Sequence, residues 1–284
     1  MSDLATTNST AELVDIGSSV EYRPLKALHI PSKSGQPAPA VLMISGLHAR
    51  EWIAPPQLIN LAQRLLQPNA TTRIDLTNLE IWIVPVANPD GYIYSWKSDR
   101  YWRKNRSKNS DGSFGVDLNR NFSYQWGQGD FSNSTINELY HGPYQTSEPE
   151  TQALQQFIDS HNLLAVVDLH AYDQSLNYPA TSKRAKSIAE KMCELIRSVH
   201  QKSYTSNGYI LPMFGGGLVD YANGVYNIDS YVLELRPNNA SNIQEYPWLS
   251  QQSPFDPPEQ EIIATWQEIE PALLYLLQQY ASSQ

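Results

Sequence analysis

The feature that most constrains the fold is an alternation of short apolar runs with longer amphipathic segments. Runs typical of buried strands lie at residues 41–45, 79–84, 163–170 and 231–235. Apolar residues at helical spacing predict helices at residues 55–66, 147–160, 183–200 and 259–280. Strands that alternate with helices predict an α/β layered domain.

Two helix boundaries carry specific signals. Ser147, with Glu150 three residues later, predicts a capping box at the start of the second helix. Pro271 predicts that a kink interrupts the last helix. The long turn-rich segments at residues 97–115 and 127–146 are expected to be ordered loops that carry function.

Composition excludes several classes of protein. A chain of 284 residues with 41% hydrophobic content can bury a sizeable core, and without repeats or linkers residues 1–284 are expected to form a single domain. The net charge of −9 opposes binding to nucleic acid, and no apolar run is long enough for a membrane span. The N-terminus lacks a signal-peptide pattern, which favours a cytoplasmic protein, or a secreted or periplasmic one if a leader has been trimmed. Nothing in the sequence indicates an oligomeric state.

The chain has one cysteine and therefore no intrachain disulfide. Cys193 aligns with the apolar positions of the segment at residues 183–200. This placement predicts an inert thiol in the core.

Three residues at the ends of apolar runs form a candidate metal site. His48 and Glu51 follow the first run and precede a helix, and His170 ends the third. Imidazole and carboxylate groups are good zinc donors, and the ends of such strands meet at one edge of a sheet. Because the spacing of His48 and Glu51 is common, structural roles for these residues stay open.

The other four histidines are expected to be structural. His29 lies at a predicted sheet edge, and His161 and His200 lie at the ends of predicted helices, where a cationic side chain complements the helix dipole. His141 belongs to a predicted turn, since no partner pattern surrounds it.

Six motifs follow one another along the chain: His48-Ala49-Arg50-Glu51-Trp52, Asn88-Pro89-Asp90-Gly91-Tyr92, Trp102-Arg103-Lys104-Asn105-Arg106, Val116-Asp117-Leu118-Asn119-Arg120-Asn121, Asp168-Leu169-His170 and Glu234-Leu235-Arg236. From about residue 12 to residue 280 the chain resembles the zinc metallocarboxypeptidases typified by pancreatic carboxypeptidases A and B. The resemblance implies an α/β/α sandwich around a mixed sheet of about eight strands, one Zn²⁺ ion, and the C-termini of peptides or proteins as substrates. Because the match begins near the start of the chain, no pro-region is expected.

The resemblance also implies roles for the residues at the metal. His48, Glu51 and His170 match the zinc ligands. Asp117 matches a carboxylate that orients a zinc-bound histidine. Glu234 matches the general base that takes a proton from the attacking water and returns it to the leaving amine.

Four further residues match groups that handle the substrate. Arg103 matches the guanidinium that stabilises the oxyanion of the tetrahedral intermediate. Asn119 and Arg120 match the pair that grips the free C-terminal carboxylate, which implies exopeptidase action. Arg50 matches a residue that helps to receive the substrate near the metal.

The chain departs from the family pattern beside the expected substrate path. Leu211 stands where the family has a mobile tyrosine, and Tyr209, two residues upstream, is a candidate replacement. Ala171 replaces a serine before Tyr172, which is expected to face the substrate.

The expected floor of the specificity pocket is aliphatic. One extra residue beside the glycines leaves either Leu218 or Val219 at that position. An aliphatic floor favours apolar or aromatic C-terminal residues. The resemblance also predicts a cis peptide between Arg236 and Pro237.

Two alternative functions stay open. A relative that trims cell-wall peptides with D-amino acids or diaminopimelate, or an amidase, would share Asn119 and Arg120. An inactive zinc-binding scaffold is disfavoured because Glu234, Arg103 and all three expected ligands are retained.

Overall fold

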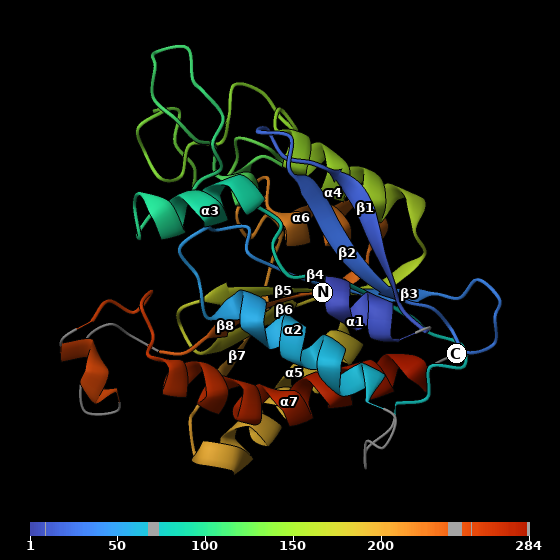
Figure 1. Ribbon diagram of the computed structural model, residues 1–284. Helices are drawn as coiled ribbons and strands as arrows, with labels where there is room; N and C mark the ends of the chain where they lie inside the picture. Colours follow the sequence, from blue (N-terminus) through green and yellow to red (C-terminus); the bar gives the residue numbers. More distant parts are fainter. Residues whose placement is uncertain (9, 68–73, 238–245, 251, 283–284) are drawn as a thin grey trace.

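The computed structural model describes residues 1–8, 10–67, 74–237, 246–250 and 252–282 (Figure 1). Its centre is an eight-stranded sheet in the order β1-β2-β4-β3-β5-β8-β6-β7. The strands are β1 (Glu12–Ser18), β2 (Pro24–Ile30), β3 (Ala40–Ser45), β4 (Glu80–Val84), β5 (Leu163–Ala171), β6 (Ser175–Pro179), β7 (Thr205–Tyr209) and β8 (Asp229–Leu235). Strands β4, β3, β5 and β8 are mutually parallel, whereas β1–β2, β2–β4 and β6–β8 pair antiparallel. The predicted α/β class and mixed eight-stranded sheet are confirmed.

Helices cover both faces of the sheet (Figure 1). They are α1 (Ser2–Thr7), α2 (Ala54–Leu66), α3 (Pro89–Lys97), α4 (Pro149–Ser160), α5 (Lys183–His200), α6 (Leu218–Tyr226) and α7 (Glu259–Ala281). Successive strand residues point to opposite faces, so Val41 and Met43 pack with α2, α5 and α7 while Leu42 and Ile44 pack with α4 and α6. The core is therefore split into two apolar layers by the central strands of the sheet, of which β3 and β5 are buried on both sides.

The predicted capping box and the predicted interruption of the last helix are both wrong. Helix α4 has Glu148 as its N-cap and Pro149 in its first turn, while the hydroxyl of Ser147 donates to Glu148 Oε1 at 2.6 Å. The Glu150 carboxylate instead accepts the backbone N–H of Val20 at 3.1 Å, so a tertiary contact replaces the capping box. Helix α7 runs from Glu259 to Ala281 with Pro271 inside it, and residues on both sides of Pro271 are buried in the core.

Other local predictions are confirmed. The Arg236–Pro237 peptide is cis, as are Leu211–Pro212 and Ala171–Tyr172. Cys193 is a free, buried thiol whose pKa burial raises to about 12. Among the described residues, no helix is both long and apolar enough to cross a membrane.

The parallel strands determine where the site forms. Ser45 at the end of β3 pairs in register with Leu169 of β5, and His170 pairs with Glu234 of β8. The carboxyl ends of three adjacent strands thus present the loop with His48, the side chain of His170 and that of Glu234 at one edge.

Candidate active site

His48, Glu51 and His170 converge on one buried point. The Nδ1 atoms of the two histidines lie 3.1 Å apart, and Glu51 places Oε1 2.8 Å from His48 Nδ1 and Oε2 3.0 Å from His170 Nδ1. These three residues form a metal-capable cluster among the described residues. The sequence placed them on separate strand ends, and the structure brings them together.

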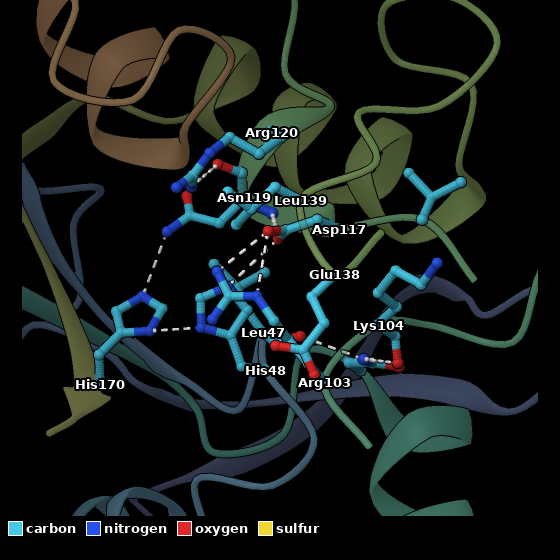
Figure 2. Close-up of polar contacts among 12 residues, drawn as sticks. Leu47, His48, Arg103, Lys104, Asp117, Asn119, Arg120, Glu138, Leu139 and His170 are labelled. Atoms are coloured by element: carbon cyan, nitrogen blue, oxygen red, sulfur yellow. Dashed lines mark hydrogen bonds and ion pairs between the residues drawn. The ribbon is translucent and has the colours of Figure 1, made fainter. Parts of the chain in front are cut away.

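Carboxylates hold the outer nitrogens of both imidazoles. Asp117 Oδ1 lies 3.2 Å from His48 Nε2, and Asp168 Oδ2 lies 2.7 Å from His170 Nε2 (Figure 2 shows the His48 contact). An ionised carboxylate only accepts hydrogen bonds, so each Nε2 is the nitrogen that donates outward, and each Nδ1 is the nitrogen that would give its lone pair to a bound metal.

The cluster is suited to a cation. Burial acts to lower the pKa of His170, but the carboxylates of Asp168 and Glu51 outweigh it and hold that pKa well above its ordinary value. Tetrahedral zinc bonds of about 2.0 to 2.2 Å place neighbouring donor atoms roughly 3.4 Å apart. The distances of 2.8 to 3.1 Å between these donors, two of which end on different oxygens of Glu51, are about 0.3 to 0.6 Å shorter than that spacing, so a small outward shift of the side chains would fit one zinc ion.

Glu234 lies beside the cluster on β8 and lines the same cavity. Burial raises its pKa to about 7, with the charges of Glu51 and Asp168 adding to the rise and those of His170 and Arg103 opposing it. A carboxyl with a pKa near neutrality can both take up and release a proton at physiological pH.

Arg103 reaches the site from the segment after α3. Its Nε and Nη2 donate to Asp117 Oδ2 at 3.1 and 3.0 Å, and its Nη1 lies 3.9 Å from Glu51 Oε1. Asp117 therefore holds a histidine of the cluster with one oxygen and this guanidinium with the other.

Asn119 and Arg120 lie on a 3-10 turn (Leu118–Arg120) whose N-cap is Asp117. Asn119 places Nδ2 3.4 Å from His170 Nε2, and its Oδ1 accepts the backbone N–H of Leu218. Arg120 donates through Nη1 to the carbonyl of Asn119 at 2.9 Å, and Phe214 stacks 4.7 Å from its Cζ. Both side chains line the cavity with their positions fixed.

The cavity has a volume of about 370 Å³. Its lining includes the predicted residues His48, Glu51, Arg103, Asn119, Arg120, His170, Tyr172 and Glu234. Sequence reasoning missed two lining residues, Phe214 and Phe255. The sequence held one signal that could have identified Phe214 as a lining residue, because it directly precedes three consecutive glycines.

Leu218 and Val219 do not line this cavity. Helix α6 begins at Leu218, whose side chain packs in the core layer with Phe122. Val219 is also fully buried and packs in a small cluster whose edge includes Phe214. Phe214, in contrast, lines the cavity.

Tyr209 does not replace the missing family tyrosine. Its hydroxyl donates to the carbonyl of Ser230 at 3.1 Å inside the fold, and burial raises its pKa. Tyr172 does face the cavity, with its ring 5.1 Å from that of Phe255. Arg50 lies outside the cavity lining, with Phe255 4.4 Å from its Cζ.

The remaining histidines have structural contacts. His29 lies between Glu12 and Glu80 on β2, an inner strand, so its expected edge position is wrong. His200 ends α5 with Nδ1 3.0 Å from Glu268, and His141 stacks on Trp126.

The fold and the site together define an α/β metallohydrolase. A family model described as zinc carboxypeptidase, Peptidase_M14, matches residues 1–272. The chain belongs to this family of metallocarboxypeptidases.

Similar proteins and solved structures support the assignment to this family. The chain is 34% identical to carboxypeptidase O of Bos taurus over 278 residues, which are 92% of this chain and 71% of that protein. It is 34% identical to carboxypeptidase A2 of Rattus norvegicus over 239 residues, covering 78% of this chain and 57% of the relative. The crystal structure of thrombin activatable fibrinolysis inhibitor superposes with a TM-score of 0.86 at 28% identity, covering 100% of this chain and 72% of that one.

Proposed function

We propose that this protein removes the C-terminal residue of peptides or proteins by zinc-dependent hydrolysis, with a preference for apolar or aromatic C-terminal residues. The observation that carries the proposal is the convergence of three metal donors, an acid and two arginines on one cavity. His48, Glu51 and His170 would hold the zinc ion. When bound, zinc supplies a Lewis acid that polarises a carbonyl and makes water more acidic.

Glu234 is the proposed general base. Its pKa of about 7 allows it to accept a proton from the attacking water and to return that proton to the leaving amine. Arg103, held by Asp117, supplies donors that stabilise negative charge on the scissile carbonyl oxygen.

Asn119 and Arg120 are the proposed contacts for the free C-terminal carboxylate. A planar guanidinium and an amide fit two carboxylate oxygens, and this recognition restricts cleavage to the end of a chain. The apolar preference is supported by Phe214, Phe255 and Ala171 in the cavity wall, whereas Leu218 and Val219 do not line the cavity.

The test measures kcat/KM on blocked dipeptides that end in Phe, Leu, Arg or Glu. Phe and Leu are expected to give the highest values, and a preference for Arg or Glu would contradict the apolar specificity. Glu234→Gln is expected to keep zinc and substrate binding while kcat falls by at least about 100-fold.

The matched control is Glu190→Gln, an exposed acid on α5 that pairs with Lys186. It is expected to retain wild-type turnover. Equal turnover in the Glu234 and Glu190 variants would show that Glu234 is not the general base.

A further inference from the structure

The carboxylate of Glu138 is paired with Arg50 through both oxygens. Arg50 Nη1 donates to Oε1 at 2.7 Å and Nη2 donates to Oε2 at 3.0 Å, while Nη1 also donates to the carbonyl of Tyr101 at 3.2 Å. Bidentate pairing, together with the ring of Phe255, holds the guanidinium in one orientation. Arg50 is thus engaged by an acid of its own chain, and its guanidinium is the less exposed partner of the pair.

The backbone around Glu138 is tied to the catalytic residues. The carbonyl of Tyr140 accepts the backbone N–H of Asp117 at 2.8 Å, and the carbonyl of Leu139 accepts that of Ser132 at 2.9 Å. Asp117 in turn holds His48 and Arg103. Glu138 is therefore positioned relative to the reacting groups by a short chain of hydrogen bonds.

A second cavity adjoins the first at Arg103, which lines both. It has a volume of about 300 Å³, and its lining includes Glu138, Asp99, Tyr101 and Trp102. Figure 2 shows Arg120 and Glu138 on opposite sides of the Asp117 carboxylate that Arg103 holds.

The second cavity offers room for the part of a substrate that lies beyond the scissile bond. A peptide with its C-terminal carboxylate at Arg120 and its scissile carbonyl at Arg103 would extend its preceding residue towards Glu138.

The charge that faces solvent beside this path is negative. The side chain of Glu138 is 58% exposed, whereas those of Arg50 and Arg103 are 14% and 13% exposed. Lys104, which also lines the second cavity, is buried and donates through Nζ to the carbonyl of Thr135 at 2.5 Å. An approaching side chain therefore meets the carboxylate of Glu138 before it meets any of these three cations.

We propose that Glu138 is a specificity-determining residue that selects, by charge, the residue preceding the C-terminal residue of the substrate. Peptides with Lys or Arg at that position are favoured, and peptides with Asp or Glu are disfavoured. This inference rests on the proposed carboxypeptidase function.

The test compares kcat/KM for three blocked dipeptides, Lys-Phe, Ala-Phe and Glu-Phe, at low and high salt. The wild-type ratio of Lys-Phe to Glu-Phe is expected to be about tenfold at low salt and to fall as salt screens the exposed carboxylate. In Glu138→Gln the ratio is expected to fall at least about threefold, the size typical of one partly exposed charge pair. The salt series needs no variant and tests the same charge effect in the unaltered protein.

Glu190→Gln removes one exposed, salt-bridged carboxylate far from the cavity in sequence and is expected to keep the wild-type ratio. A wild-type kcat/KM ratio of Lys-Phe to Glu-Phe near one would overturn the inference, and so would an unchanged ratio in Glu138→Gln. In either case, hydrolysis of Ala-Phe would leave the proposed carboxypeptidase function standing. Failure of the wild-type protein to hydrolyse all three peptides would overturn both.

Discussion

Replacing Asp117 by Asn tests whether one buried carboxylate supports both the metal site and the oxyanion site. Asp117 Oδ1 contacts His48 Nε2 at 3.2 Å and accepts the backbone N–H of Asn119 at 3.0 Å, while Oδ2 accepts two N–H groups of Arg103. Burial alone would raise the pKa of Asp117, but Arg103 and His48 hold it well below its usual range, so the group is ionised. The substitution removes this charge without changing the size of the side chain.

The expected loss of stability follows from the hydrogen bonds that the Asn amide cannot accept. Its nitrogen must face either the N–H of His48 or the N–H groups of Arg103, and either choice leaves a buried donor unpaired at a cost of about 1 to 3 kcal/mol. Because Arg103 also loses its buried counter-charge, the free energy of unfolding is expected to fall by about 3 to 5 kcal/mol in total. The lost orientation of His48 is expected to weaken zinc binding about 10- to 100-fold.

The assay is competition for zinc with a chromophoric chelator, combined with denaturant unfolding of the metal-free protein. Asp220→Asn is the matched control, because Asp220 is a buried acid that accepts backbone N–H groups of Met213 and Phe214 and contacts no cluster histidine. The control is expected to lose stability and keep zinc affinity. Zinc affinity of the Asp117 variant within about twofold of wild type would refute the reasoning.

Three further predictions concern the fold. Burial raises the pKa of Glu150 from 4.5 to about 7, so the folded protein retains a proton that the unfolded chain releases in that interval. The free energy of unfolding is therefore expected to fall as pH rises from about 4.5 to 7. In Glu150→Gln, denaturant titrations across this pH range are expected to show a fall that is smaller by up to roughly 3 kcal/mol, and the same pH dependence as wild type would contradict the prediction. Cys193, with its pKa raised to about 12, is expected to react with thiol reagents only at the rate of unfolding, and fast labelling of the native protein would be inconsistent with its burial. Gly215→Ala is expected to destabilise the protein by several kcal/mol, measured by thermal unfolding, because φ is +72° and an added Cβ would lie 1.1 Å from the carbonyl oxygen of Gln128; a wild-type Tm would contradict this.

The metal ligands were predictable because their positions depend on strand ends. His48 and His170 follow apolar runs whose β-character is visible in sequence, and parallel pairing brings such ends to one edge of the sheet. Glu234 was identified through the family resemblance, and the structure places it on β8 in register with His170.

The cavity wall was less predictable because it depends on loops held by distant contacts. Phe214 is positioned by Asp220, which accepts its backbone N–H at 2.9 Å, and by the close approach of Gln128 to Gly215. The start of α6 at Leu218 turns that residue and Val219 into the core. The local signal for this boundary, which sequence reasoning missed, is Gly217 as the N-cap with Asp220 three residues later. Phe255 lies in an irregular segment without apolar periodicity, so its place beside Tyr172 could not be inferred.

One carboxylate connects the parts of the site that the sequence presents as separate motifs. The side chain of Asp117 holds His48 and Arg103, its backbone N–H binds the carbonyl of Tyr140, and Glu138 lies two residues before that carbonyl. A shift of Asp117 would therefore displace His48, Arg103 and the segment that carries Glu138 together. Substitutions at these residues are expected to be non-additive, because residues within one hydrogen-bond network share the cost of its disruption.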